Sequence, residues 1–163
     1  MSEQKTIALV TGATGVIAGV IAEALAATPD YEVVILARNE KKAQKTVARI
    51  QKATGNAAVR YLIADVSRRD SVRQASEAWD GRLNILVNAA GIEIEKTIED
   101  TTLEEWNRIF AINVTGTFLT SKYALPLLRK SAGASLINFG SYDGFIADPG
   151  LAAYCATKGA VHA

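Results

Sequence analysis

Short apolar runs alternate along the chain with longer segments in which apolar residues recur every three or four positions. The short runs are nearly continuous, which is typical of strands that helices cover on both faces. They predict strands at residues 6–10, 32–37, 57–63, 83–87 and 134–139. The longer segments predict helices at residues 15–28, from 40 to about 50, around 72–79, at 103–130 and from 151 onward. This order predicts an α/β fold, a doubly wound parallel sheet of the Rossmann type with right-handed crossovers.

Several residues mark where these elements should begin, bend or end. Asn39 is a candidate cap for the second helix, and Thr28-Pro29 should end the first. Pro126 predicts a kink in the long helix. The longest loop is expected at residues 140–150, and Trp79 and Trp106 are expected in the core rather than in a site.

Composition narrows the function classes. The 163 residues suit one domain over residues 1–163, and a net charge of +1 gives no sign of a nucleic-acid partner. One cysteine excludes an internal disulfide and a multi-cysteine zinc site, and we predict no metal. The start, Met1 to Thr6, does not look like a signal peptide, and no apolar run reaches the roughly 18 residues of a membrane span. We therefore expect a cytoplasmic protein without a membrane partner.

A glycine-rich segment follows the first predicted strand and opens the first helix. Glycines allow a sharp turn and close approach of the backbone to a pyrophosphate, whose charge suits the free N–H groups of a helix N-terminus. The candidate phosphate-binding residues are Gly12, Thr14, Gly15 and Ile17. The alternative is a tight strand–helix turn without a ligand.

The end of the second predicted strand bears on which dinucleotide would bind. An acidic residue there would hold the ribose hydroxyls of NAD, but the sequence has Arg38 followed by Asn39. Because a guanidinium can hold a 2′-phosphate with two hydrogen bonds, we favour NADP (NADPH) over NAD. The alternative is a solvated arginine at the start of a helix.

Tyr154 and Lys158 form the chain's only pair of a tyrosine followed four residues later by a lysine. On a helix this spacing puts both side chains on one face. Tyrosine has an ordinary pKa of about 10, and a nearby ammonium favours the phenolate form that acid–base chemistry requires. The alternative is an ordinary helix with an aromatic residue and a solvated lysine. His162, the only histidine, is given no role.

These motifs together resemble the short-chain dehydrogenase/reductase family. Gly12 and Gly15 match the glycine spacing of its longer-chain branch, and Asn88-Ala89-Ala90-Gly91 is similar to its Asn-Asn-Ala-Gly motif. Asn113 begins another similar motif, Asn113-Val114-Thr115-Gly116, and Ser141 precedes Tyr154 as in the family's catalytic stretch. The resemblance covers essentially the whole chain, with the motifs in the family's order.

The resemblance implies an NAD(P)-dependent oxidoreductase that interconverts a carbonyl and an alcohol by hydride transfer. Tyr154 would exchange a proton with the substrate oxygen, which Ser141 would hold. Lys158 would bind the nicotinamide ribose and bias the phenol, and Asn113 would support a proton-relay water. Asp65 would accept a hydrogen bond from the adenine amine. The remaining cofactor contacts would come from Val66, Asn88, Ala89, Ala90 and Gly91.

The same resemblance predicts a small carbonyl or alcohol substrate and a homo-oligomer in the intact family form. Family members run to roughly 250 residues, whereas this chain ends one turn past Lys158, at the start of the catalytic helix. We therefore expect the usual C-terminal strands and lid to be missing. A piece of an enzyme and a non-catalytic dinucleotide-binding or decoy module both remain open. A sugar-nucleotide epimerase, suggested only by the glycine spacing, is a further alternative.

Overall fold

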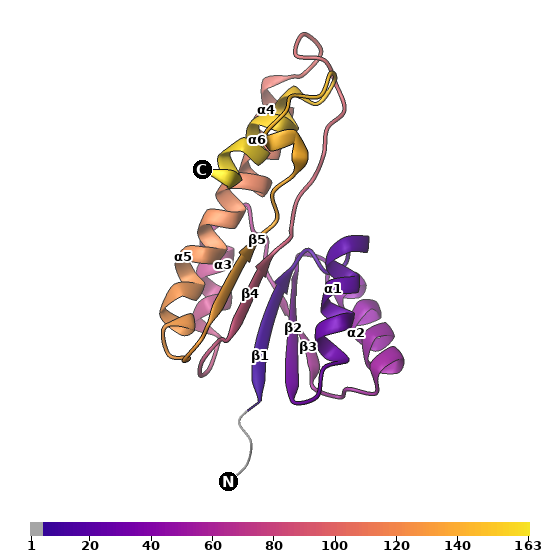
Figure 1. Ribbon diagram of the computed structural model, residues 1–163, viewed down its shortest axis with the longest axis vertical. Helices are drawn as coiled ribbons and strands as arrows, with labels where there is room; N and C mark the ends of the chain where they lie inside the picture. The colour runs from indigo at the N-terminus through magenta and orange to yellow at the C-terminus, as the bar shows by residue number, and fades with distance from the viewer. Residues whose placement is uncertain (1–4) are drawn as a thin grey trace.

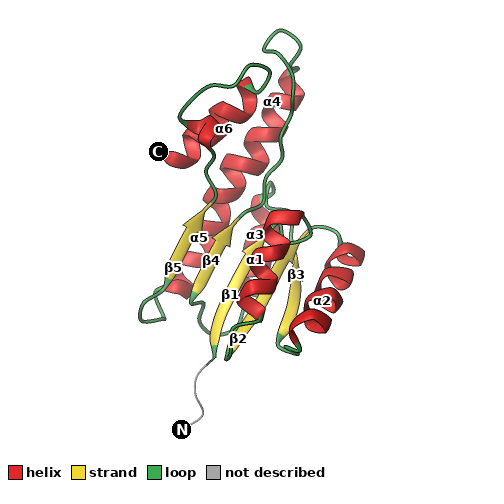
Figure 2. Cartoon of the chain, turned by 45° about the vertical axis from the view of Figure 1, so that its right-hand side comes forward, coloured by secondary structure: helices red, strands yellow, loops and turns green. Residues whose placement is uncertain are grey.

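The computed structural model describes residues 5–163 and contains a five-stranded parallel sheet with helices on both faces (Figures 1 and 2). The first residues of the chain, on which the expectation of no signal peptide rests, lie outside the described part. The strands are β1 (Thr6–Thr11), β2 (Tyr31–Ala37), β3 (Val59–Ile63), β4 (Ile85–Asn88) and β5 (Ser135–Asn138). Their order across the sheet is β3-β2-β1-β4-β5. The Rossmann-type parallel sheet is therefore confirmed.

The helices fall close to the predicted segments. They are α1 (Val16–Ala26), α2 (Glu40–Thr54), α3 (Arg69–Glu77), α4 (Leu103–Phe110), α5 (Gly116–Leu128) and α6 (Ala152–His162). Two shorter elements accompany them, the π-helix η1 (Ala111–Thr115) and the 3₁₀ turn η2 (Tyr142–Gly144). Within residues 5–163 no helix has both the length and the apolar character needed to cross a membrane.

Two apolar clusters hold the layers together. One lies between the sheet and the α1–α2 layer, where Val33 and Ile35 of β2 have no exposed surface and Ile50 of α2 packs against them. The other lies on the opposite face, where Trp79 and Leu128 pack against the sheet. Trp79 is thus a core residue, as predicted, although it follows α3 rather than lying within it.

The long helix is interrupted where we did not expect it. A π-helical turn at Ala111–Thr115 separates α4 from α5, and α5 continues through Pro126 to Leu128. Gly116 follows this turn, and a Cβ there would come within 3.0 Å of Val66, so the glycine lets the helix approach the loop after β3. The sequence does signal the break, because Asn113, Thr115 and Gly116 are all poor helix formers.

The longest connection is also not the predicted one. Residues 89–102, between β4 and α4, form a longer segment than the loop around residues 140–150, which contains η2. The two loops meet where the Lys96 N–H donates to the Gly150 carbonyl oxygen at 2.7 Å. This contact closes the end of the molecule that lies beyond the carboxyl ends of β4 and β5 (Figure 1).

Candidate functional site

The order of the strands creates the candidate site. The chain runs outward from β1 through β2 to β3 and then returns to place β4 on the other side of β1. Ligands of open α/β sheets bind at this reversal, beyond the carboxyl ends of the strands. The segments that leave β1 and β4 meet there, because the hydroxyl oxygen of Thr11 accepts hydrogen bonds from the N–H groups of Ala89 and Ala90, both at 3.0 Å.

Gly12 is required by this close approach. Its φ is +75°, and a Cβ would lie 2.7 Å from the Cα of Ala90. Gly15 then caps α1 through its backbone, and its N–H donates to the carbonyl oxygen of Gly12 at 2.9 Å. Val16 takes the first helical position with its side chain in solvent. The turn therefore needs glycine at Gly12, whereas a β-branched residue fits at Val16.

A cavity of about 310 Å³ opens between this turn and the ends of β2 and β3. Many of the predicted cofactor residues line it, namely Gly12, Thr14, Gly15, Arg38, Asp65, Val66, Ala90 and Gly91. It also contains residues that the sequence analysis missed, among them Lys42 and Ile112. Lys42 could have been found from its position four residues after Arg38, in the first turn of the predicted helix.

The N-terminus of α1 suits an anion in this cavity. Its first turn has no acidic residue and its cap residue makes no side-chain hydrogen bond, so its N–H groups are available at the end that carries the positive helix dipole. Arg38 and Lys42 add two cationic side chains to the same wall. The described residues thus offer a negatively charged ligand three separate favourable contacts.

A second cavity, of about 230 Å³, continues from the first and shares Gly91 and Ile92 with it. Its lining comes from Ile17, Ala89, Gly91, Ile92, Glu93, Phe139, Gly140, Tyr154 and Lys158. Tyr154 and Lys158 therefore face one space although their helix lies far along the chain from the glycine turn. We refer to these two adjoining cavities, whose linings extend from Arg38 to Tyr154, as the groove.

Lys158 is buried, and its ammonium is held by the chain itself. Its Nζ donates to the carbonyl oxygen of Phe139 at 2.7 Å, at the exit of β5. It also lies 5.5 Å from the centre of the Tyr154 ring. Burial lowers the pKa of the Lys158 ammonium below its ordinary value, because the charged form loses its hydration.

Ser141 follows the end of β5 near Tyr154 and Lys158, but its hydroxyl is hydrogen-bonded to another residue. Its hydroxyl donates to the carboxylate of Asp143 at 2.8 Å and accepts the Asp143 N–H at 3.2 Å, which caps η2. Gly140, the preceding residue, is the one that lines the cavity with Tyr154. The structure thus brings the Ser141 backbone to the site without directing its hydroxyl to Tyr154.

Asn113 sits in the π-helical turn and is nearly fully buried. Its side-chain oxygen accepts the Ile92 N–H, and its amide nitrogen donates to the Ile92 carbonyl oxygen, both at 2.9 Å. The amide also donates to the hydroxyl of Thr157 on α6 at 3.0 Å. Asn113 therefore fastens the cavity wall at Ile92 to the helix that carries Tyr154 and Lys158.

Three other predicted residues make hydrogen bonds that stabilise the structure around the cavity. Asn88 links two strands, since its amide donates to the side-chain oxygen of Asn138 at 3.0 Å, and its own side-chain oxygen accepts the Thr120 hydroxyl at 2.7 Å. Asn39 caps α2 by accepting the Lys42 N–H at 2.9 Å. Asp65 accepts the Ser67 hydroxyl at 2.7 Å, so its carboxylate shapes the turn before α3 while it also lines the cavity.

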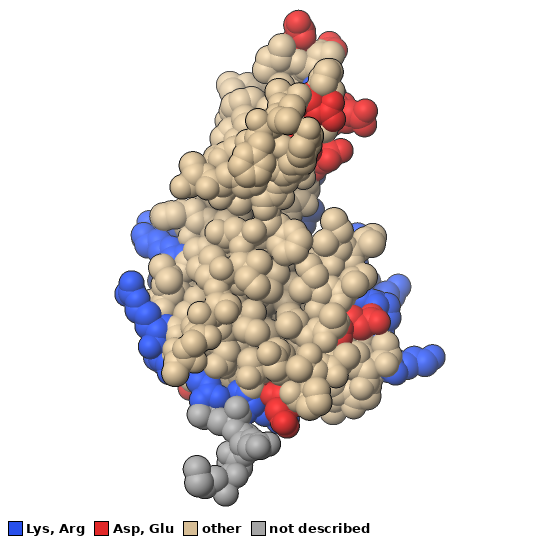
Figure 3. Space-filling model, viewed as in Figure 1, with Lys and Arg blue, Asp and Glu red and all other residues tan. Residues whose placement is uncertain are grey.

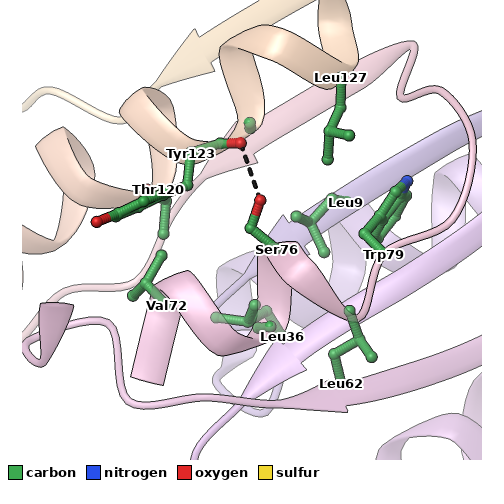
Figure 4. Close-up of a pocket in the computed structure, with 11 residues that line it drawn as sticks. Leu9, Leu36, Leu62, Val72, Ser76, Trp79, Thr120, Tyr123 and Leu127 are labelled. Carbon is green, nitrogen blue, oxygen red and sulfur yellow. Dashed lines mark hydrogen bonds between the residues drawn. The ribbon is translucent and has the colours of Figure 1, made fainter. Parts of the chain in front are cut away.

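A third cavity is small and apolar (Figure 4). It measures about 30 Å³ and lies between the sheet, α3 and α5, with Leu9, Leu36 and Trp79 in its wall. Ser76, which also faces it, donates its hydroxyl to the Tyr123 carbonyl oxygen at 3.1 Å. A wall of this kind, with its polar groups already satisfied, is a gap in packing rather than a place for chemistry.

Comparisons with known proteins agree with this geometry. The family model for short chain dehydrogenases matches residues 6–163. This chain belongs to the short-chain dehydrogenase family. It is 34% identical over 162 residues to 2-(S)-hydroxypropyl-CoM dehydrogenase 3 of Xanthobacter autotrophicus, covering 98% of this chain and 62% of that protein.

Two further relatives carry information on the cofactor. The NADP-dependent (R)-specific alcohol dehydrogenase of Lentilactobacillus kefiri is 35% identical over 159 residues, which cover 95% of this chain and 62% of that protein. An alcohol dehydrogenase of the archaeon Thermococcus sibiricus, solved with 5-hydroxy-NADP, superimposes with a TM-score of 0.88 at 27% identity. That match covers 97% of this chain and 67% of the archaeal one. The chain therefore spans less than two thirds of the length of the two relatives matched by sequence.

Proposed function

We propose that the groove binds a nicotinamide dinucleotide and that Tyr154 exchanges a proton with a carbonyl or alcohol substrate beside it. The observation that carries this proposal is that the two cavities adjoin at shared lining residues. One contains the glycine turn and the other contains Tyr154 and Lys158, and Gly91 and Ile92 line both. A ligand with a phosphate-bearing half and a reactive half suits such a groove.

The first cavity fits the adenosine and pyrophosphate portion. The N–H groups at the start of α1 would hold the pyrophosphate, and Gly12 leaves room for it beside Ala90. Asp65 and Val66 would border the adenine. Arg38 and Lys42 would hold a 2′-phosphate, which is why we propose NADP rather than NAD. The relative from Lentilactobacillus kefiri, named as NADP-dependent, supports the same preference.

The second cavity supports the proton transfer. The bound dinucleotide would supply or accept the hydride. In the reducing direction the hydroxyl of Tyr154 would donate its proton to the carbonyl oxygen, and in the oxidising direction the phenolate would take it back. Lys158, 5.5 Å from the Tyr154 ring, favours the phenolate by its charge, and its bond to Phe139 keeps it in place.

Ser141 and Asn113 would complete the site. To hold the substrate oxygen, the Ser141 hydroxyl must exchange its bond to Asp143 for one to the substrate, so we propose that substrate binding breaks the 2.8 Å contact. Asn113 would keep the wall at Ile92 in register with α6 and would support a proton-relay water near Lys158.

One observation favours a second candidate function. The Ser141 hydroxyl is bonded to Asp143 and is not part of the lining around Tyr154, as a dinucleotide-binding module without turnover would allow. We keep this module as the alternative. Of the enzyme alternatives, the dehydrogenase names of the relatives favour an oxidoreductase over an epimerase.

We further propose a small alcohol or carbonyl as the substrate and a homo-oligomer as the working form. The exposed apolar side chains of Leu103, Phe118 and Leu125 on α4 and α5 would suit a subunit contact. A single domain and a cytoplasmic location complete the proposal.

The Tyr154→Phe variant tests the proposed chemistry. It removes the exchangeable proton and keeps the ring, so we expect NADPH binding within about twofold of the unchanged chain and reduction of a panel of carbonyl compounds at least about a hundredfold slower. Calorimetry measures the binding and NADPH absorbance the reduction. A chain that binds NADPH but reduces no compound of the panel, with or without the substitution, is the non-catalytic module. A chain that binds neither NADPH nor NADH contradicts both candidates.

A further inference from the structure

His162 is a residue of chemical interest that the proposed reaction leaves unused. It lies in the last turn of α6, four residues after Lys158 and eight after Tyr154. These spacings put all three side chains along one face of the helix. Lys158 contacts the segment that leaves β5, through the carbonyl oxygen of Phe139 at 2.7 Å. His162 contacts the same segment two residues further on.

The imidazole of His162 fits closely into that segment. Its Nε2 accepts the Ser141 N–H at 3.3 Å, and its ring stacks on Phe145 with 4.0 Å between the centroids and 22° between the planes. A Cβ on Gly140 would overlap the imidazole, and a Cβ on Gly144 would come within 2.7 Å of it. Both glycines therefore leave the space that the imidazole fills.

We propose that His162 is a positioning residue for Ser141, holding the segment Gly140–Phe145 against α6 through the acceptor nitrogen of a neutral imidazole. Gly140 lines the cavity of Tyr154 and Lys158, so the contact with His162 would determine where this segment meets the substrate. Any catalytic consequence rests on the proposed function. The contact between His162 and the segment does not depend on a ligand or on turnover.

The proposal fixes the chemical form of the imidazole. To accept at Nε2, the ring must be neutral and carry its proton on Nδ1. A protonated ring has only donors, so the Nε2–H would face the Ser141 N–H and the hydrogen bond between His162 and Ser141 would be lost. The other titratable groups of the segment and helix that form this contact are Tyr142 and Asp143 in η2, and Tyr154, Cys155 and Lys158 on α6.

Nuclear magnetic resonance of the ¹⁵N-labelled full chain, without a histidine tag, tests this directly. His162 is the only histidine, so its ring nitrogens need no assignment by mutation. At pH 8 we expect a protonated Nδ1 and an unprotonated Nε2. The opposite tautomer overturns the proposal, because a protonated Nε2 could not accept the Ser141 N–H.

Two variants separate the hydrogen bond from simple packing. His162→Phe keeps an aromatic ring against Phe145 but has no acceptor, so hydrogen exchange of the Ser141 amide should become about tenfold faster. His162→Gln keeps a side-chain acceptor and should recover part of the protection. The Phe139 amide, bonded to the Asn88 carbonyl oxygen at 3.1 Å, is the internal control and should not change. Equal exchange of Ser141 in all three chains contradicts the proposal.

These measurements do not depend on turnover. If exchange of the Ser141 amide depends on His162 while Tyr154→Phe changes no reaction rate, the proposed function fails and the positioning role stands. If the reaction depends on Tyr154 while His162→Phe leaves Ser141 exchange unaltered, the positioning role fails and the proposed function stands.

Discussion

The two sides of the sheet are built differently, although each contributes half of the groove. On the β1–β2 side, Val33, Val34 and Ile35 have no exposed surface, and helices cover both faces. On the β5 side all four strand residues are exposed, with 37% of Leu136 and 45% of Ile137 accessible. The face around β4 and β5 also shows few charged side chains (Figure 3). The glycine turn thus rests on a packed core, whereas the segments around Tyr154 and Lys158 rest on individual polar contacts.

This contrast assigns different physical origins to the two halves of the site. The half proposed to bind phosphate needs a rigid backbone turn, which burial of β1 and β2 supplies. The other half, proposed to be the reactive one, is joined to the rest by Asn88 to Asn138, Lys158 to Phe139 and Asn113 to Thr157. Each neutral bond of this kind contributes only about 0.5–1.5 kcal/mol net, and the charged bond of Lys158 about 1.5–3 kcal/mol. We therefore expect core substitutions to act on global stability and polar substitutions to act locally near α6.

The largest expected difference comes from truncating one isoleucine on each side. Ile35→Ala leaves a cavity in a fully buried strand and should lower the free energy of unfolding by about 2–5 kcal/mol. Ile137→Ala removes a side chain that is already 45% exposed and should cost about 1 kcal/mol or less. Urea denaturation followed by circular dichroism measures both. Equal losses would mean that β5 is as well packed as β2.

The second prediction concerns the glycine turn and has a matched control. Gly12 and Gly55 have φ values of +75° and +72°, but only at Gly12 would a Cβ meet backbone, whereas the space around Gly55 is open. Alanine at either position incurs a strain of about 1–2 kcal/mol. Gly12→Ala should cost a further ~1–3 kcal/mol, because Ala90 must move.

Binding should separate the same two variants more clearly. Gly12→Ala displaces the wall that is proposed to hold the pyrophosphate, so calorimetry should show NADPH affinity reduced at least about tenfold. Gly55→Ala should bind as tightly as the unchanged chain. Similar affinities for the two variants would remove the glycine turn from the binding site.

The features that could be predicted from the sequence also differ between the buried strands and the polar contacts near α6. The buried strands and the Asn39 cap were predictable, because they depend on continuous apolar runs and on a local side chain. The role of Asn113 in joining Ile92 to Thr157 was not, because it depends on contacts between distant segments, although the poor helix formers around Asn113 do signal a break in the helix. His162 was missed for the same reason, since only the fold brings it to Ser141, whereas Lys42 could have been found from its spacing to Arg38.

The third prediction tests the charge at the outer end of the groove. Arg38 and Lys42 line the first cavity, so Arg38→Leu and Lys42→Leu should each weaken NADPH binding by about tenfold. NADH lacks the 2′-phosphate, so its affinity should hardly change. Lys41→Leu removes a neighbouring exposed charge that is not part of the cavity lining and serves as the control. If all three variants lose NADPH affinity equally, general surface charge is responsible rather than a 2′-phosphate contact.

The smallest expected effect is the pH dependence contributed by Lys158. Burial lowers its pKa in the folded chain, while the unfolded chain keeps the ordinary value of 10.5. Between these two values the unfolded state binds more protons, so the free energy of unfolding rises with pH there. Well below the folded pKa both states are protonated and the folded chain bears the full cost of burying the charge. Raising the pH through the folded pKa removes that cost.

Lys158→Met isolates this contribution, because every other titrating group is common to the two chains. The free energy of unfolding of the unchanged chain minus that of the variant should be level well below the folded pKa of Lys158 and should then rise until about pH 10.5. Urea denaturation at a series of pH values measures the difference. A level or falling difference would mean that the Lys158 ammonium is hydrated in the folded chain. The reactive half of the groove would then be open to water rather than closed around Tyr154.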